Sequence, residues 1–400
     1  MSKIVFFCIP AHGHTNPTLG VVRELVSQGH EVWYYSYGPL REKIESTGAK
    51  FISCDEYDTQ QRLTPKDGAR IGKDIGFSTK ILVDTTLELD AVVCRDMERI
   101  KPDCIVADSM ALWGKMAAEK LGIPFVSSTT TFAFNQYSSR IMKKSGKELL
   151  NMIFSMPGAG RQVKRLQKHG YPVKNILDII SNDNQTDTIV YTSAEFQPCA
   201  ETFSDKYAFV GPSILPVCKP VEKRREKLIY ISMGTVDNDM PSFYRNCIDA
   251  LKDTDYQVIL SVGDGVDLAQ LGKLPEHISV FSRVDQIAVL EQADVFLSHC
   301  GMNSVNESLY FGVPLVMFPQ TTEQCGVAAW VEQLGAGLRL AKTTPSAINE
   351  AVEQVVGNPD FRRQAENIAE GFRRCSGAKG AAEKILSVCR REDPGLNCNN

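Results

Sequence analysis

Residues with the chemistry of an anion site lie close together near position 300. An apolar run, Val295 to Ser298, ends at His299, a turn through Gly301 follows, and a helix is expected to open near Asn303 or Ser304. The unpaired amides and the positive dipole end of such a helix start attract anions. Gly301 lets the backbone approach a ligand, and His299 and Ser304 add side-chain donors. This pattern suits a diphosphate.

A second polar pair follows the next predicted strand. Leu315 to Phe318 is another apolar run, and the turn after it carries Glu323 and Gln324. Open α/β sheets bind ligands outside the carboxyl ends of their strands, and both polar clusters fall at such ends. A structural alternative remains for part of the pattern, because Ser304 and Glu307 have the spacing of a helix capping box.

Two histidines follow the first predicted strand, Lys3 to Ile9, in the sequence His12-Gly13-His14. A histidine at the carboxyl end of a strand could act as a general base, because imidazole titrates near neutrality. Such a base gains from a carboxylate that fixes its tautomer. Asp108 directly follows another predicted strand, 103–107, and is the candidate for this carboxylate. Its structural alternative is to cap a helix that begins at Ser109.

The stretch 294–324 resembles the nucleotide-sugar signature of the UDP-dependent glycosyltransferases. The segment 310–316, YFGVPLV, also resembles the corresponding segment of bacterial macrolide- and flavonoid-type glucosyltransferases. The resemblance implies the following donor contacts: diphosphate to His299, Gly301, Asn303 and Ser304, ribose hydroxyls to Glu307, and sugar hydroxyls to Glu323 and Gln324. A Gly-His-x-x-Pro pattern in the family selects His14, rather than His12, as the base that takes a proton from the acceptor.

A third patch, Arg283-Val284-Asp285-Gln286, lies where the family usually has an aromatic-x-Pro-Gln sequence that packs the uracil. Gln286 matches that sequence, whereas Arg283 and Asp285 depart from it. Thr235 is expected near the donor phosphates. The nearby Asp237-Asn238-Asp239 looks like a metal motif of another glycosyltransferase fold. We interpret it as structural, with Asp239 capping the next helix, and predict no metal and no cofactor.

The bulk composition excludes several classes of protein. The chain of 400 residues is 43% hydrophobic and 23% charged, with a net charge of -4, which argues against a general nucleic-acid binder. Its twelve cysteines show no C-x-x-C spacing, so we expect reduced thiols in a cytoplasmic protein and no zinc site. No apolar run reaches the roughly 18 residues of a membrane helix. We expect a monomer or weak homodimer.

Strand and helix signals alternate twice along the chain, which predicts two parallel sheets covered by helices. The segment 211–227 has three prolines and a charge run, the composition of a linker. We therefore predict an acceptor-binding domain over 1–210, a UDP-sugar domain over 228–376 and a final helix over 377–391. A disordered tail is predicted over 392–400. The resemblance makes this the GT-B fold, with two Rossmann-like domains across a cleft and the last helix packing back on the first domain.

The acceptor is expected to contact the irregular insertion 131–187. Its aromatic and methionine side chains suit a flat apolar molecule, although local helix packing explains any one of them equally well. The candidates are Phe132, Phe134, Tyr137 and Met142.

The sequence thus predicts an inverting transferase that moves a hexose, expected to be glucose, from a UDP-sugar to a hydroxyl of a macrolide, flavonoid or other phenolic acceptor. Two alternatives stay open: a nucleotide-sugar 2-epimerase of the same fold, and a non-catalytic sugar-nucleotide-binding partner. A dehydrogenase is disfavoured, because no G-x-G-x-x-G sequence follows the first strand.

Overall fold

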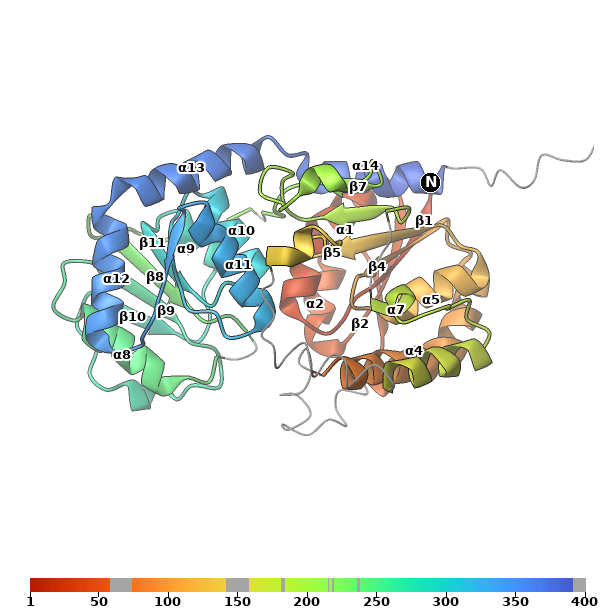
Figure 1. Ribbon diagram of the computed structural model, residues 1–400, viewed down its shortest axis with the longest axis horizontal. Helices are drawn as coiled ribbons and strands as arrows, with labels where there is room; N and C mark the ends of the chain where they lie inside the picture. Colours follow the sequence, from red (N-terminus) through yellow and green to blue (C-terminus); the bar gives the residue numbers. More distant parts are fainter. Residues whose placement is uncertain are drawn as a thin grey trace, which may run out of the picture.

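The computed structural model describes residues 1–57, 74–141, 158–180, 184–214, 216–217, 219–235 and 238–390. They form two α/β halves, each built on a parallel sheet (Figure 1). This confirms the predicted fold class. No helix of the described residues is long and apolar enough to cross a membrane.

The first half is built on a sheet with the strand order β3-β2-β1-β4-β5-β6-β7, in which every pairing is parallel. Its strands are β1 Lys3–Phe7, β2 Glu31–Ser36, β3 Lys50–Ser53, β4 Cys104–Asp108, β5 Phe125–Thr129, β6 Thr188–Val190 and β7 Tyr207–Phe209. Its helices are α1 His12–Ser27, α2 Arg41–Glu45, α4 Ile75–Ile100, α5 Leu112–Leu121 and α7 Leu177–Ile180, with residues 158–168 also helical. Short 3-10 turns are η1 Gly38–Leu40, η2 Asp55–Tyr57, η4 Ser138–Ile141 and η5 Ala200–Thr202.

The second half has the parallel strand order β10-β9-β8-β11-β12-β13. Its strands are β8 Leu228–Ser232, β9 Gln257–Ser261, β10 Ile278–Phe281, β11 Val295–Ser298, β12 Leu315–Met317 and β13 Gly337–Arg339. The remaining elements are α8 Pro241–Leu251, η6 Leu268–Leu271, α9 Gln286–Leu290, α10 Met302–Tyr310, α11 Thr322–Gln333, α12 Pro345–Gly357, α13 Pro359–Arg373 and α14 Gly377–Cys389.

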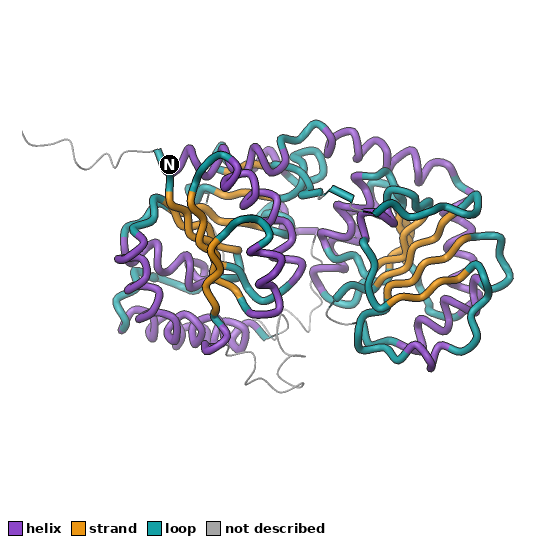
Figure 2. Tube along the Cα trace, turned by 180° about the vertical axis from the view of Figure 1, so that it is seen from behind, coloured by secondary structure: helices purple, strands orange, loops and turns teal. Residues whose placement is uncertain are grey.

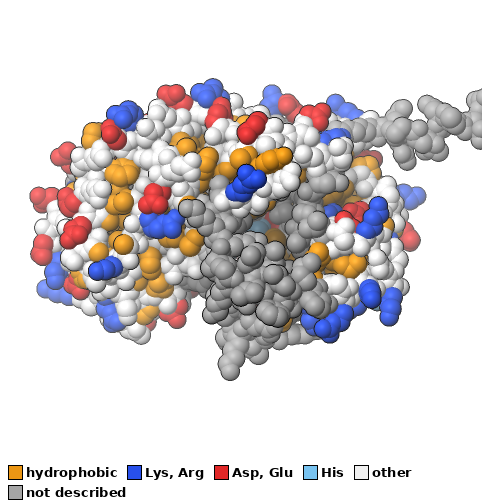
Figure 3. Space-filling model, in the orientation of Figure 1, with side chains coloured by type: hydrophobic (Ala, Val, Ile, Leu, Met, Phe, Trp, Pro, Cys, Tyr) orange, Lys and Arg blue, Asp and Glu red, His pale blue; other side chains and the backbone are white. Residues whose placement is uncertain are grey.

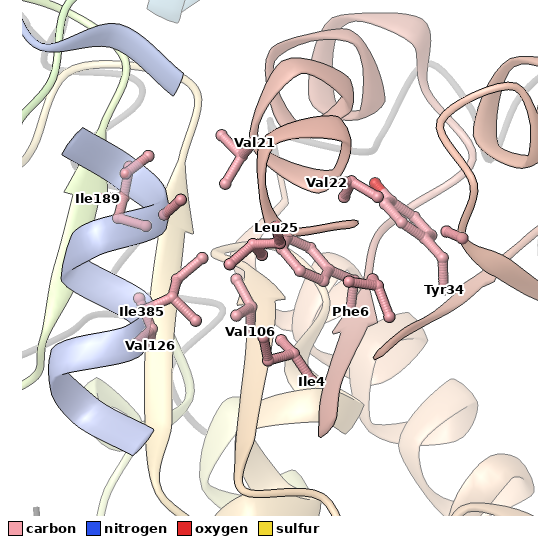
Figure 4. Close-up of a cluster of buried hydrophobic side chains, with 14 of the residues drawn as sticks. Ile4, Phe6, Val21, Val22, Leu25, Tyr34, Val106, Val126, Ile189 and Ile385 are labelled. Atoms are coloured by element: carbon pink, nitrogen blue, oxygen red, sulfur yellow. The ribbon is translucent and has the colours of Figure 1, made fainter. Parts of the chain in front are cut away.

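The last two helices join the halves. Seen from behind, the helical path through α13 and α14 runs along one side of both sheets (Figure 2). Ile385 of α14 is fully buried in the core of the first half, and Figure 4 shows it beside Val126 and Ile189. Burying one such side chain contributes about 1.5–3 kcal/mol, so α14 is an integral part of the first core.

Both sheets reverse their strand order at one point, and a ligand crevice is expected there. In the first sheet the reversal lies between β1 and β4, and in the second it lies between β8 and β11. The residues that follow β1 and β11 include His14 and His299. The two candidate clusters therefore occupy the switch points of the two sheets.

The starts of helices α1 and α5 decide how the residues after β1 and β4 are placed. Helix α1 starts at His12, so both histidines lie in its first turn. Helix α5 starts at Leu112 and not at Ser109, because Asp108 first closes a turn: its Oδ1 accepts from Met110 N (2.9 Å) and its carbonyl from Ala111 N (2.8 Å). Asp108 is therefore not a helix cap.

Candidate active site

His14 and Asp108 are in direct contact. The Nδ1 atom of His14 lies 2.8 Å from Oδ2 of Asp108, although 94 residues separate them in the chain. The Asp108 side chain is 1% exposed, whereas the His14 side chain keeps 28% of its surface exposed. A buried carboxylate on Nδ1 favours the tautomer with the proton there, which leaves Nε2 as the basic nitrogen.

Two carboxylates raise the basicity of the His14 ring. Burial of the ring opposes protonation, but the charge and hydrogen bond of Asp108, and the charge of Glu323, outweigh it and raise the pKa of His14. The hydroxyl of Thr130 lies 3.2 Å from the same Nδ1 atom. Glu323 belongs to the second half, whereas His14, Asp108 and Thr130 belong to the first.

Pro17 opens a contact across the seam between the halves. Proline has no N–H, so it cannot donate to the carbonyl four residues earlier, which is that of Gly13. The Gly13 carbonyl instead accepts from the Nδ2 amide of Asn303 in α10. The first turn of α1 and the first turn of α10 therefore meet, and Figure 3 shows a histidine surface at the seam between the halves.

The turn between β11 and α10 is tightly constrained around the His299 ring. A Cβ atom on Gly301 would lie 2.6 Å from His299 Nε2, and one on Gly234 would lie 2.6 Å from the same ring. Cys300, between His299 and Gly301 in the chain, has φ of 66°, a left-handed conformation that costs a non-glycine residue roughly 1–3 kcal/mol. Strain and close approach of this kind are typical of a ligand-binding turn.

Glu307 of α10 belongs to a part-buried polar cluster with Ser304 of α10, Gln286 of α9 and Tyr230 of β8. Gln286 donates from Nε2 to Glu307 Oε2 (2.5 Å) and to Ser304 Oγ (3.2 Å), and it accepts from Tyr230 Oη (3.2 Å). Burial raises the pKa of Glu307 to about 7, although the Gln286 hydrogen bond opposes this rise and the charge of Asp285 adds to it. A carboxylate held in this way can accept from hydroxyl groups of a ligand.

The alternative role of Ser304 and Glu307, a capping box, is absent, because α10 begins at Met302 with Gly301 as its N-cap. A capping box occurs instead at the start of α11. There Thr321 Oγ1 accepts from Gln324 N (3.3 Å), and Gln324 Oε1 accepts from Thr321 N (3.1 Å). The side-chain oxygen of Gln324 is thus occupied by the cap, which leaves its amide nitrogen as the group that can contact a ligand. Glu323, the next residue toward the N-terminus, is exposed.

Comparisons with known proteins agree with this geometry. Residues 245–375 match the family model described as "Erythromycin biosynthesis protein CIII-like, C-terminal domain". The chain is 34% identical over 396 residues to the NDP-glycosyltransferase YjiC of Bacillus licheniformis, with 96% of each chain covered. It is 31% identical to the uncharacterized UDP-glucosyltransferase YdhE of Bacillus subtilis, over 98% of this chain and all of the relative. The chain belongs to the bacterial glycosyltransferases.

A solved structure supports the same conclusion about the fold. The calicheamicin glycosyltransferase CalG4 superimposes with a TM-score of 0.83 and is 26% identical, over 98% of this chain and 100% of CalG4. The predicted GT-B architecture is therefore confirmed. Further relatives are the demethyllactenocin mycarosyltransferase of Streptomyces fradiae, 29% identical, and the oleandomycin glycosyltransferase of Streptomyces antibioticus, 26% identical.

The other residues predicted to contact the sugar donor lie at the same edge of the second sheet of the glycosyltransferase. One of them, Arg283, differs in chemistry from the residue usual in the family. Arg283 is exposed, and its Nε donates to Asp264 Oδ2 (2.9 Å). Val284 packs against the core of the second half, and Thr235 is an exposed residue three positions after β8. The structure thus offers an ion-paired guanidinium where the family usually presents an aromatic ring.

The prediction that Asp239 caps the next helix is wrong. Helix α8 begins at Pro241 with Met240 as its N-cap, and no side chain caps it. The neighbouring Asn238 donates from Nδ2 to the Gly234 carbonyl (2.8 Å) and so braces the loop after β8. Asp237 lies outside the described residues.

The predicted acceptor residues are only partly suited to that role. Phe132 is 1% exposed and packs at a tilt against Phe196 with ring centroids 5.5 Å apart, so it is a core residue between the halves, and its contact with the acceptor stays a prediction. Phe134 packs against the same core. Tyr137 is 44% exposed and stays a candidate, and Met142 lies outside the described residues.

Thr130 and Asn306 belong to the site but were not predicted. Thr130 follows the end of β5, beside Asp108 on β4, so its place after a strand was a usable signal. Asn306 is 2% exposed on α10, and its partners lie in the first half. No local pattern reveals such a partner, because the contact joins residues more than a hundred positions apart.

Proposed function

We propose that the protein transfers a hexose, glucose in the first instance, from a UDP-sugar to a hydroxyl group of a small apolar acceptor, with inversion at the anomeric carbon. The pairing of His14 Nδ1 with Asp108 Oδ2 at 2.8 Å, directly across the seam from the start of α10, carries this proposal. The pair supplies a base on one side of the seam, and the start of α10 supplies an anion site on the other.

The donor is proposed to bind on the second half. Its diphosphate would accept hydrogen bonds from amides at the start of α10, with His299, Gly301, Asn303 and Ser304 around it, because helix starts stabilise anions. Glu307 would accept from the ribose hydroxyls, and Glu323 and Gln324 would hold the sugar. Arg283 and Gln286 would border the uracil ring of the donor, since a guanidinium can also stack on a planar ring.

The first half is proposed to supply the base. Nε2 of His14 removes the proton of the acceptor hydroxyl, and Asp108 stabilises the imidazolium that results. The acceptor oxygen then attacks the anomeric carbon from the side opposite the leaving UDP. Charge on the departing diphosphate is stabilised by preorganised donors, so we propose that no metal is needed.

The relatives support the choice of donor. YdhE is named a UDP-glucosyltransferase and YjiC an NDP-glycosyltransferase, so a nucleotide donor with glucose is the first to test. Oleandomycin glycosyltransferase, 26% identical, favours macrolides among the first acceptors, and phenolic compounds such as flavonoids come next.

The test incubates the protein with UDP-glucose, with and without a phenolic or macrolide acceptor and with and without a chelator. Acceptor-dependent UDP release, an inverted anomeric centre in the product by NMR and activity in excess chelator are expected. Isomerisation of the donor without acceptor would instead indicate an epimerase. Binding of UDP-glucose without turnover across a broad acceptor library would indicate a non-catalytic binding protein.

A further inference from the structure

Helix α10 contacts both halves of the molecule. Ser304 and Glu307 face the polar cluster around Gln286 in the second half. Asn306, which lies between them in the sequence, is 2% exposed and bonds to the first half. Its Nδ2 donates to the Tyr191 carbonyl (2.9 Å), and its Oδ1 accepts from Thr192 Oγ1 (3.2 Å). Helix α10 thus carries both the residues proposed to bind the sugar donor and a buried link to the other half.

The partners of Asn306 are themselves tied to the edge that carries the His14–Asp108 pair. Tyr191 follows β6 directly, and its N–H donates to the Thr129 carbonyl (3.3 Å), next to Thr130. Its hydroxyl accepts from Ser128 Oγ (3.2 Å), and Ser128 is paired with Asp108 in the register of β4 and β5. A short, continuous set of contacts therefore runs from Asn306 to the surroundings of the base.

A second contact and close packing restrict α10 further. Asn303, one turn before Asn306, donates to the Gly13 carbonyl next to His14. Between these two links lies a cavity of only about 10 Å³, lined by residues that include Pro17, Tyr191 and Glu307.

We propose that Asn306 is a positioning residue for sugar transfer. By joining α10 to the segment after β6, it fixes the distance between the anion site at the start of α10 and the imidazole of His14. This inference rests on the proposed function, because it assumes that the donor diphosphate binds at α10. In-line displacement is sensitive to this distance, since a displacement of about 1 Å can cost on the order of 100-fold in rate.

The perturbing variant is Asn306→Asp, which keeps the size of the side chain but turns an oxygen toward the Tyr191 carbonyl. We expect kcat to fall about 10- to 100-fold while the KM for UDP-glucose stays within about threefold, because the groups that bind the donor are untouched. Thr192→Val removes only one of the two bonds and should lower kcat in the same direction by a smaller factor.

The matched control is Asn246→Asp. Asn246 also donates from Nδ2 to a backbone carbonyl, that of Thr343 (2.8 Å), but both residues lie in the second half. We expect its kcat to equal that of the unchanged protein. A fall in kcat as large as that of Asn306→Asp would show that loss of any such bond suffices, and it would overturn the inference.

A second readout does not depend on activity. Fluorophores carried by an unnatural amino acid at positions 168 and 252, both exposed and on different halves, report the distance between the halves. Asn306→Asp should broaden or lengthen this distance distribution, and Asn246→Asp should not. If Asn306→Asp does not fold, Thr192→Val takes its place in both measurements.

The outcomes separate this inference from the proposed function. If the unchanged protein transfers sugar but both link variants keep its kcat and its distance distribution, the positioning role is wrong and the proposed function stands. If the unchanged protein transfers no sugar, the proposed function fails, and the distance measurement alone decides the structural claim: unchanged distances overturn it. An increase in donor KM equal to the loss of kcat/KM would also overturn it, because Asn306 would then act on binding.

Discussion

The buried carboxyl group of Glu307 should make the free protein less stable as the pH rises. Its pKa is raised to about 7 from an ordinary value of 4.5, chiefly by burial. Below pH 4.5 the group is protonated in both the folded and unfolded states, so it costs nothing. Between pH 4.5 and 7 the unfolded chain ionises first, and the folded state loses stability until the group ionises there as well.

The size of this loss follows from the two pKa values. The gap between 4.5 and about 7 corresponds to roughly 3 kcal/mol. Because the Glu307 side chain keeps some solvent contact at the seam, we expect about 2–3 kcal/mol. Glu307→Gln removes the charge and keeps the shape. At pH 8 its free energy of unfolding should exceed that of the unchanged protein by this amount, and at pH 4 the two should agree.

The assay is urea unfolding of both proteins from pH 4 to 8, without nucleotide. Other titrating groups are common to both proteins, so the difference between the two free energies of unfolding isolates position 307. A difference that stays constant over this range, or one that favours the unchanged protein more strongly as the pH rises, would refute the argument that Glu307 is held in an environment hostile to its charge.

Three further substitutions test separate parts of the site. Phe132→Ala should lower the free energy of unfolding by about 3–5 kcal/mol and leave the acceptor KM unchanged, and a selective rise in that KM would show that Phe132 is an acceptor contact. Gly301→Ala should push the His299 ring aside and weaken UDP binding by roughly tenfold in calorimetry, whereas equal affinity would contradict the constrained turn. Pro17→Ala restores an N–H for the Gly13 carbonyl, so kcat should fall severalfold without loss of thermal stability; unchanged kcat would show that the Asn303 contact is dispensable.

Much of the architecture was accessible from the sequence because parallel sheets impose simple rules. Residues that follow strands collect at one edge, so His14 and Asp108 could be placed together before any coordinates were known. The polar pattern around His299 was predicted for the same reason. In each case the evidence lies within one strand–turn–helix unit, and the fold repeats that unit.

Other features depend on contacts that no local pattern contains. Thr321 and Gln324 form the capping box that the spacing also allowed at Ser304 and Glu307, and the start of each helix decided between the two sites. Phe132 has an aromatic side chain of the kind that contacts apolar ligands, but the side chains packed around it come from distant segments. The link from Asn306 to Tyr191 is of the same kind, because buried polar partners are set by tertiary packing.

The central claim is that the Asp108 carboxylate tunes His14 as the base. The most direct measurement is the pH dependence of kcat/KM for the unchanged protein and for Asp108→Asn. Because Asp108 raises the pKa of His14 and the neutral ring is the active form, activity should rise with pH through that pKa. Asp108→Asn should move this rise to lower pH and reduce kcat by roughly 10²–10⁴, with little change in donor affinity. A rise at the same pH, or an unchanged kcat, would contradict the account.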